Sequence, residues 1–180
     1  MSEPRVILHT ERLTLRELSL ADVPALAAIL GDPEVMRFSV RGPLSEQATA
    51  EFVEWANRCY VADGFGPWAV IEVSSGLLAG FCALNREEVD RADEVEIGYR
   101  LAPAFWGRGL GTEAALATLA HGFENLRLES IIAIVQPANV ASVRVIKKVG
   151  FSDFVYSQYH RLGVRIYRMT LKQWLARRSC

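Results

Sequence analysis

The sequence has few cysteines, almost no net charge and no long apolar run. Its three cysteines, Cys59, Cys82 and Cys180, are far apart and odd in number, which indicates neither a disulfide framework nor a structural zinc site. Reduced thiols of this kind are typical of a cytoplasmic protein, and we expect that location. Charged residues interrupt the first segment, so we expect no signal peptide, and no apolar run reaches the length of a membrane span.

Charge and histidine content exclude two further classes of site. The formal net charge is −1 with the basic residues scattered, so direct nucleic-acid binding is not expected. Only Lys172–Arg178 is locally basic, and we interpret it as the solvated face of a terminal helix. The three histidines, His9, His121 and His160, show no metal-ligand spacing, so no metal is expected.

The pattern of apolar residues predicts one mixed α/β domain. The chain has 180 residues, 51% of them hydrophobic, and contains no repeat or linker, so residues 1–180 are expected to fold as a single domain. The predicted order is β-α-α-β-β-β-α-β-α-β-β, an α+β arrangement with a mostly antiparallel sheet. The predicted strands are 13–16, 68–73, 77–84, 95–101, 131–135, 154–159 and 164–171, and the predicted helices are 23–30, 45–64, 111–124 and 140–149.

A glycine-rich segment leads into the third predicted helix. It runs Trp106-Gly107-Arg108-Gly109-Leu110-Gly111-Thr112. The first amides of a helix lack partners and carry partial positive charge, and glycines allow the backbone to approach an anion closely. Arg108 can add further charge. Taken alone, the segment is equally compatible with a phosphate-binding loop and with a turn that binds nothing.

Two other nucleotide-binding patterns compete for the same glycines. A P-loop is excluded because no Lys-Ser or Lys-Thr pair follows the last glycine. The dinucleotide fingerprint matches formally as Gly109-x-Gly111-x-x-Ala114, with Glu129 18 residues after Gly111. Its context is wrong, since the loop does not directly follow a strand and no repeated βαβ array surrounds it. A dinucleotide-binding oxidoreductase is therefore the weaker alternative.

Three motifs in sequence order resemble the GNAT superfamily of N-acetyltransferases, and in particular its ribosomal-protein (RimJ/RimL-type) branch. The resemblance spans nearly the whole chain. It is carried by residues 10–16 (TERLTLR), 31–36 (GDPEVM), 96–101 (EIGYRL) with 106–114 (WGRGLGTEA), and 137–142 (PANVAS) with 148–151 (KVGF). The wider superfamily has Gln or Arg three residues before Gly109; Trp106 stands there, as is common in the RimJ/RimL-type branch.

The resemblance implies a splayed sheet and acetyl-CoA as co-substrate. Two strands, 95–101 and 131–136, would part so that pantetheine binds the edge of the first, near Tyr99 and Leu101. The glycine-rich segment would bind the pyrophosphate, and Asn139 the cofactor arm. The expected cofactor-binding residues are Tyr99, Leu101, Trp106, Gly107, Arg108, Gly109, Leu110, Gly111, Thr112, Asn139 and Ser142.

Acyl transfer to an amine requires a base for the amine proton and an acid for the leaving thiolate. Glu96 is the expected base, because it lies on the pantetheine strand among apolar neighbours that can raise its pKa. Glu94, on the same face of the strand, is the alternative base. The non-catalytic alternative is that Glu96 is a strand carboxylate whose charge an arginine neutralises. The tyrosine that often serves as acid in the superfamily is replaced by Ile146.

The resemblance to the RimL-type branch assigns the acid role to Ser142. Ser142 can equally be a first-turn helix residue capped by Asn139, with solvent protonating the thiolate. The strand tyrosines Tyr156, Tyr159 and Tyr167 are weaker candidates.

The sequence thus predicts an enzyme that moves an acetyl group from acetyl-CoA to a primary amine, for example the α-amino group of a protein or peptide. A non-catalytic acyl-CoA-binding module of the same fold is the main alternative. The acceptor itself is not predicted, although its pocket is expected between the two N-terminal helices, the loop around residues 38–44 and the closing strands. A homodimer through edge strands is left open.

Overall fold

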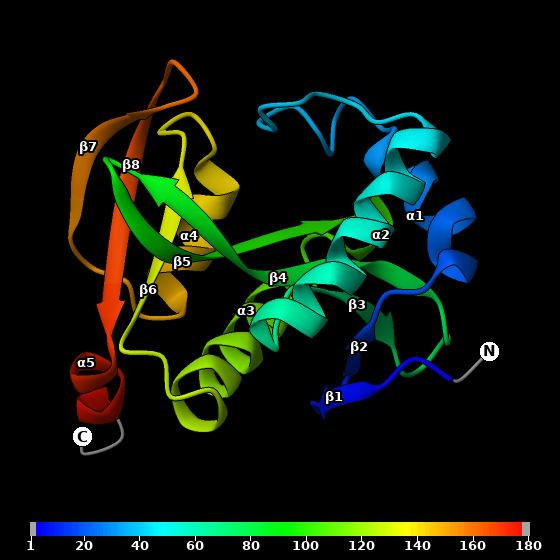
Figure 1. Cartoon of the computed structure of the whole chain (residues 1–180), viewed down its shortest axis with the longest axis horizontal. Coiled ribbons are helices and arrows are strands. Elements are labelled where there is room, and N and C mark those ends of the chain that lie inside the picture. Colours follow the sequence, from blue (N-terminus) through cyan, green and yellow to red (C-terminus); the bar gives the residue numbers. More distant parts are fainter. Residues whose placement is uncertain (1–2, 178–180) are drawn as a thin grey trace.

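The computed structural model describes residues 3–177, which form a mixed sheet with helices on both faces (Figure 1). The strands are β1 (Val6–His9), β2 (Leu13–Glu17), β3 (Pro67–Glu72), β4 (Leu78–Val89), β5 (Ala92–Leu101), β6 (Ser130–Val135), β7 (Phe154–Tyr159) and β8 (Leu162–Thr170). The α-helices are α1 (Val23–Leu30), α2 (Glu46–Asp63), α3 (Leu110–Ala120), α4 (Val140–Lys148) and α5 (Leu171–Ala176). Short turns η1 (Leu20–Asp22) and η2 (Pro103–Phe105) are 3₁₀ helices, and η3 (His121–Asn125) is π-helical. Within these described residues no helix is long and apolar enough to cross a membrane.

Every predicted strand and helix is present, and the predicted fold class is confirmed. The caps follow the sequence, since Ser45 accepts from the Ala48 amide and Gly64 ends α2 in the left-handed conformation. Strand β1 was not predicted, because its four residues are a short run without alternation. The third helix changes to a π turn after Ala120, earlier than predicted. A helix in the basic C-terminal segment is present as α5, although Arg178 and Cys180 lie outside the described residues.

The sheet has the order β1-β2-β3-β4-β5-β6-β8-β7, and only β5 and β6 are parallel neighbours. These two strands share a single register pair, Glu96 with Ile132. By contrast, β4 and β5 remain paired from Gly80–Leu101 to Val89–Ala92. Beyond Glu96 the edge of β5 therefore has no neighbouring strand, as the predicted splay requires.

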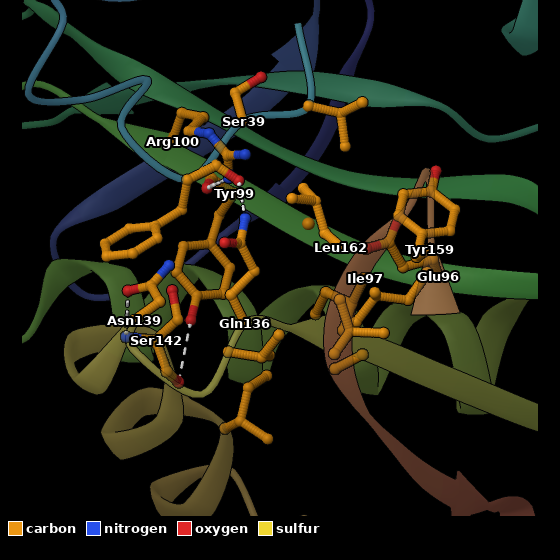
Figure 2. A pocket seen from close by; sticks show the side chains of 18 of the residues that line it. Ser39, Glu96, Ile97, Tyr99, Arg100, Gln136, Asn139, Ser142, Tyr159 and Leu162 are labelled. Carbon is orange, nitrogen blue, oxygen red and sulfur yellow. Dashed lines mark hydrogen bonds between the residues drawn. The ribbon is translucent and has the colours of Figure 1, made fainter. Parts of the chain in front are cut away.

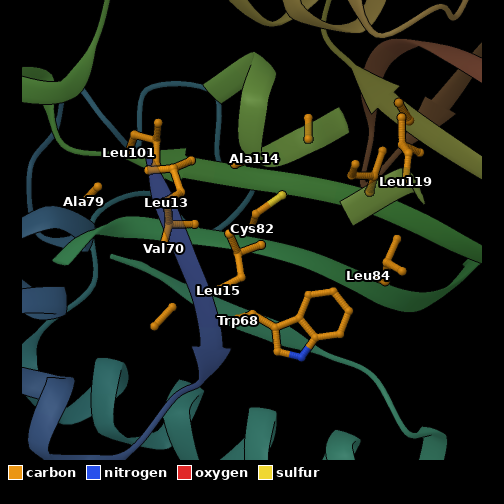
Figure 3. Packing of buried hydrophobic residues seen from close by; sticks show 14 of the residues in the cluster. Leu13, Leu15, Trp68, Val70, Ala79, Cys82, Leu84, Leu101, Ala114 and Leu119 are labelled. Atoms are coloured by element: carbon orange, nitrogen blue, oxygen red, sulfur yellow. The ribbon is translucent and has the colours of Figure 1, made fainter. Parts of the chain in front are cut away.

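The helices divide between the two faces of the sheet, and β4 shows the division. Phe81 contacts the Phe52 ring of α2, with ring centroids 5.2 Å apart. Its neighbour Cys82 contacts the Thr118 hydroxyl of α3, with an O–S distance of 3.2 Å. Because successive strand residues point to opposite faces, α2 and α3 cover opposite sides of the sheet. The core beneath α3 is closely packed around Trp68, which is fully buried (Figure 3).

Gly80 fixes the approach of β4 to β5. It has a φ of 151°, and a Cβ at this position would overlap the backbone carbonyl of Arg100. A backbone atom cannot turn away as a flexible side chain can, so any side chain would force the two strands apart.

We expect Gly80→Ala to lower the free energy of unfolding by at least about 2 kcal/mol, because it combines a disfavoured φ with a backbone clash. Chemical denaturation measures the change. Gly163→Ala is the matched control, since Gly163 is an exposed strand glycine whose added Cβ meets nothing within 4 Å. Equal stability of the two variants would contradict the close approach at Gly80.

Candidate active site

The glycine-rich segment forms the entry to α3. Gly107 and Gly109 both have positive φ, 69° and 79°, and Gly109 is the N-cap of the helix. The amide of Glu113 donates to the Gly109 carbonyl at 3.0 Å. The amides of Leu110, Gly111 and Thr112 precede this first helical bond and remain free to bind an anion.

A clamp from the β1–β2 turn holds this loop from behind. The Glu113 carboxylate accepts from the Thr10 hydroxyl at 2.6 Å, from the Arg12 amide at 3.0 Å and from Arg12 Nε at 2.7 Å. The Arg12 guanidinium also donates to the Arg108 carbonyl at 2.8 Å. Burial by itself would raise the pKa of Glu113, but these hydrogen bonds outweigh it and hold the pKa below its ordinary value.

Arg108 does not direct its charge at the loop amides. Its guanidinium forms an ion pair with the buried carboxylate of Glu72 at the end of β3. Leu101 and Trp106 are also joined, because Trp106 Nε1 donates to the Leu101 carbonyl at 2.7 Å. The expected pyrophosphate site thus consists mainly of backbone amides, with Arg108 bracing the loop from outside.

The start of α4 lies opposite the exposed edge of β5. Asn139 is the N-cap of this helix, and its side-chain oxygen accepts from the Ser142 amide at 3.2 Å. The Tyr99 hydroxyl faces the Ser142 carbonyl at 3.5 Å, at the long limit of a hydrogen bond. Burial raises the pKa of Tyr99 to about 12, so its phenol is neutral. Ile146 is buried one turn further along α4.

Two adjoining cavities meet at this point. One, of about 470 Å³, extends over the glycine-rich loop and α4; the other, of about 250 Å³, lies between β5, β6, β8 and the α1–α2 loop. The residues common to both linings are Phe38, Tyr99, Arg100, Asn139 and Ser142. The first cavity fits an extended phosphate-bearing cofactor, and the second is small enough for the end of an acceptor.

Glu96 lines the smaller cavity, next to Tyr159 (Figure 2). Burial and, to a lesser extent, the nearby Glu87 raise the pKa of Glu96 to about 8, although Arg100 partly offsets this. Tyr159 in turn donates to Glu87 at 2.9 Å. A carboxylic acid with such a pKa exchanges protons near neutral pH, as a general base for an amine must.

On this strand an arginine pairs with the carboxylate of Glu94 and not with that of Glu96. Arg168 of β8 holds Glu94 through both guanidinium nitrogens, one of them at 2.9 Å. No arginine or lysine among the described residues forms an ion pair with Glu96. The geometry therefore distinguishes two acidic residues that occupy the same face of β5.

The α1–α2 loop closes the smaller cavity. Gln136, directly after β6, donates from its side chain to the Phe38 carbonyl at 2.9 Å. Residues 38–41 of this loop line the cavity together with Tyr159, Leu162 and Val164 from the closing strands. The predicted loop and strands are thus present, whereas helices α1 and α2 themselves do not line it.

Some residues of the site were not predicted. The Arg12–Glu113 contact joins positions 101 residues apart, and no local pattern indicates it. The sequence around Gln136 does not indicate its contact with Phe38 either. Arg100 could have been found by alternation, since Gly98 and Arg100 follow Glu96 on one face of the strand.

Comparisons with known proteins agree with this geometry. The family model described as acetyltransferase (GNAT) domain matches residues 12–152. The Bacillus subtilis protein YkkB is 33% identical over 144 residues, covering 79% of this chain and 83% of its own. A GNAT-family acetyltransferase structure from Bacillus anthracis has a TM-score of 0.79 at 27% identity, covering 92% of this chain and 98% of that one.

A structure of RimL, a ribosomal alpha-N-protein acetyltransferase, in complex with coenzyme A has a TM-score of 0.77 at 20% identity. It covers 94% of this chain and 99% of the other, and shares the fold. The chain belongs to the GNAT acetyltransferase family, and acetyl-CoA is its co-substrate.

We expect Arg12→Met to weaken acetyl-CoA binding about tenfold and to lower the free energy of unfolding by about 1 kcal/mol, because charge-assisted bonds that shape the loop are lost. Calorimetric titration and denaturation measure the two effects. The stability term is present at neutral pH and disappears as the pH falls through the lowered pKa of Glu113.

Arg5→Met is the control for this variant, because Arg5 forms an exposed ion pair with Glu17 away from the loop. It should change stability by less than about 0.5 kcal/mol and leave acetyl-CoA affinity unchanged. Equal loss of affinity in both variants would contradict the clamp.

Proposed function

We propose that residues 1–180 act as one N-acetyltransferase domain that transfers the acetyl group of acetyl-CoA to a primary amine, with Glu96 as general base. The observation that carries the proposal is the Glu96 carboxylate, which lines the smaller cavity and whose pKa is raised to about 8 there. An acyl-CoA-binding module without turnover has no need of such a group. The α-amino group of a protein or peptide is the acceptor class that we favour, by analogy with RimL.

In this proposal the larger cavity holds the cofactor. The free amides of Leu110, Gly111 and Thr112 bind the pyrophosphate, with Trp106, Gly107, Arg108 and Gly109 shaping the loop. The exposed edge of β5 at Tyr99 and Leu101 contacts pantetheine, and Asn139 and Ser142 contact the arm beside it. The Leu101 carbonyl already accepts from Trp106 and the Tyr99 carbonyl from Arg100, so pantetheine binds chiefly through the backbone groups of this edge that these side chains leave free.

The acceptor enters the smaller cavity, where Glu96 takes the proton that the amine must lose. Tyr159 and Glu87 form a hydrogen-bonded pair next to Glu96 and can pass this proton toward solvent. Apolar side chains of β6 and β8 and the loop held by Gln136 exclude water from the reacting atoms. Positioning of the amine supplies a further part of the rate enhancement.

Ser142 is the group that we assign to the leaving thiolate. Its hydroxyl lies in the lining common to both cavities, and Tyr99 is close by. Both hydroxyls are weaker acids than a thiol, whose ordinary pKa is about 8.5. Their contribution is therefore a hydrogen bond to the sulfur, and solvent restores the proton.

The proposal also includes a cytoplasmic location and assembly as a homodimer. Cys59 and Cys82 are free thiols, in agreement with a reducing cytoplasm. The β7 edge exposes Val155 and Tyr156, and a homodimer through this strand is the assembly that we favour.

Glu96→Gln should lower kcat by about 10²-fold or more while acetyl-CoA affinity stays unchanged, because general-base catalysis is lost but the binding groups remain. In the wild type, kcat/KM should rise with pH through about 8 as Glu96 and the acceptor amine both lose a proton, and the variant should keep only the part of the rise that is due to the amine. Steady-state release of CoA measures both.

Glu88→Gln is the matched control for this experiment, since Glu88 is an exposed carboxylate on the neighbouring strand β4. If Glu96→Gln keeps the wild-type kcat, Glu96 is not the general base. If the 10²-fold loss of kcat occurs in Glu94→Gln and not in Glu96→Gln, Glu94 is the base.

Ser142→Ala should lower kcat about tenfold, the value of one neutral hydrogen bond to the leaving group, with little effect on acetyl-CoA affinity. The kcat values of Ser142→Ala and Tyr99→Phe are to be compared in the same assay. A loss confined to Tyr99→Phe would transfer the role to the phenol, and no loss in either variant would leave protonation to solvent alone.

A further inference from the structure

Successive residues of β5 point to opposite faces of the sheet, and the register with β4 shows which face each one occupies. Tyr99 is paired with Cys82, so it lies on the face covered by α3 and turns toward α4. Arg100 is paired with Phe81, which contacts α2 on the other face. Arg100 therefore shares its face with Glu96 and Gly98, on the side of the α1–α2 loop.

Arg100 has no carboxylate partner. The ion pairs among residues 3–177 use Arg5, Arg12, Arg16, Arg86, Arg108 and Arg168, and all of them leave Arg100 out. Its guanidinium donates from Nη1 to the Tyr99 carbonyl at 2.9 Å. Burial lowers the pKa of Arg100, and electrostatic interactions with Glu96 and Tyr99 only partly counteract this. Arg100 is half-buried, and the guanidinium donors that do not contact Tyr99 are available to an anion that enters the cavity.

Arg100 lines the larger cavity as well, but other cations are available there for the cofactor phosphates. The larger cavity has cations of its own in Arg37, Arg144 and Lys148, and they accompany the glycine-rich loop. None of these three lines the smaller cavity. Arg100 instead stands where the cavities join, with its guanidinium at the opposite end of the smaller one from Glu96 (Figure 2).

Between Glu96 and Arg100 the floor of the cavity is open. Gly98 occupies the intervening position on the same face, and a Cβ there would meet nothing within 4 Å. Four residues of strand separate the Cα atoms of Glu96 and Arg100 by about 13 Å, and both side chains reach into that interval. What remains fits one or two residues of an extended chain. Arg41, from the α1–α2 loop, adds a second cation to the lining.

We propose that the acceptor carries a carboxylate within one or two residues of its reacting amine, and that Arg100 binds this carboxylate while Glu96 receives the amine. This inference rests on the proposed acetyl transfer, because it names the acceptor class of the same site. Arg100 is then a specificity-determining residue: a peptide with an acidic residue at its first or second position has both groups at the required spacing.

The test uses pairs of C-terminally amidated peptides that differ only in one carboxylate. Asp-Ala-Ala is compared with Asn-Ala-Ala, and Ser-Asp-Ala with Ser-Asn-Ala, with propylamine as an amine that carries no carboxylate; kcat/KM is measured for the wild type, Arg100→Met and Arg100→Lys. At least one acidic peptide should exceed its amide partner about tenfold or more in the wild type, as a charge-assisted hydrogen bond allows. The preference should disappear in Arg100→Met and return in part in Arg100→Lys.

Arg58→Met is the control, because Arg58 is an exposed residue of α2 outside both cavity linings. It should keep the wild-type preference, and acetyl-CoA affinity should be the same in all four proteins. Equal acetylation of acidic and amide peptides would overturn the carboxylate site and leave the proposed transferase intact. A loss of acetyl-CoA affinity in Arg100→Met would assign the arginine to the cofactor instead. Failure to acetylate any peptide or propylamine would overturn both proposals.

Discussion

The parting of β5 from β6 is the constraint on which the site depends. A continuous sheet would satisfy the backbone groups of β5 with a neighbouring strand and would leave no space between them. Here the two strands share one register pair, at Glu96, and then diverge. The same divergence exposes hydrogen-bonding backbone, opens both cavities and places Glu96 at the vertex, where burial acts most strongly on its carboxyl group.

Strand alternation then assigns two tasks to one short segment. Tyr99 and the neighbouring α3 and α4 belong to the side with the glycine-rich loop, whereas Glu96, Gly98 and Arg100 face the α1–α2 loop. Two reactants can thus approach one strand from different sides and meet at the residues that line both cavities, among them Tyr99 and Arg100. The loop bridge from Gln136 to Phe38 closes the second side.

The sequence was informative where a local pattern is sufficient. Helix caps at Ser45 and Asn139, the glycines before α3 and the strand alternation around Glu96 each depend on neighbours within a few positions. The fold class follows from these elements and from the family resemblance. Contacts between distant parts of the chain could not be predicted this way: Glu113 with Arg12, Glu72 with Arg108, and Glu94 with Arg168.

Because of those distant ion pairs, the roles of Glu94 and Arg108 could be assigned only from the structure. Glu94 and Glu96 are indistinguishable by alternation, and only the position of Arg168 on another strand separates them. Arg108 looked like a phosphate ligand in a glycine-rich segment, but Glu72 holds its guanidinium. A single sequence shows which residues are charged and does not show which of them neutralise one another.

Gly80 has a consequence for how this fold can diversify. A side chain at position 80 would clash with the backbone carbonyl of residue 100 and not with the arginine side chain there. Position 80 therefore accommodates only glycine, while the side chain at position 100 can be substituted without a change in the spacing of the two strands. A lineage descending from this protein could acquire new acceptors through changes at position 100 and still inherit the same scaffold.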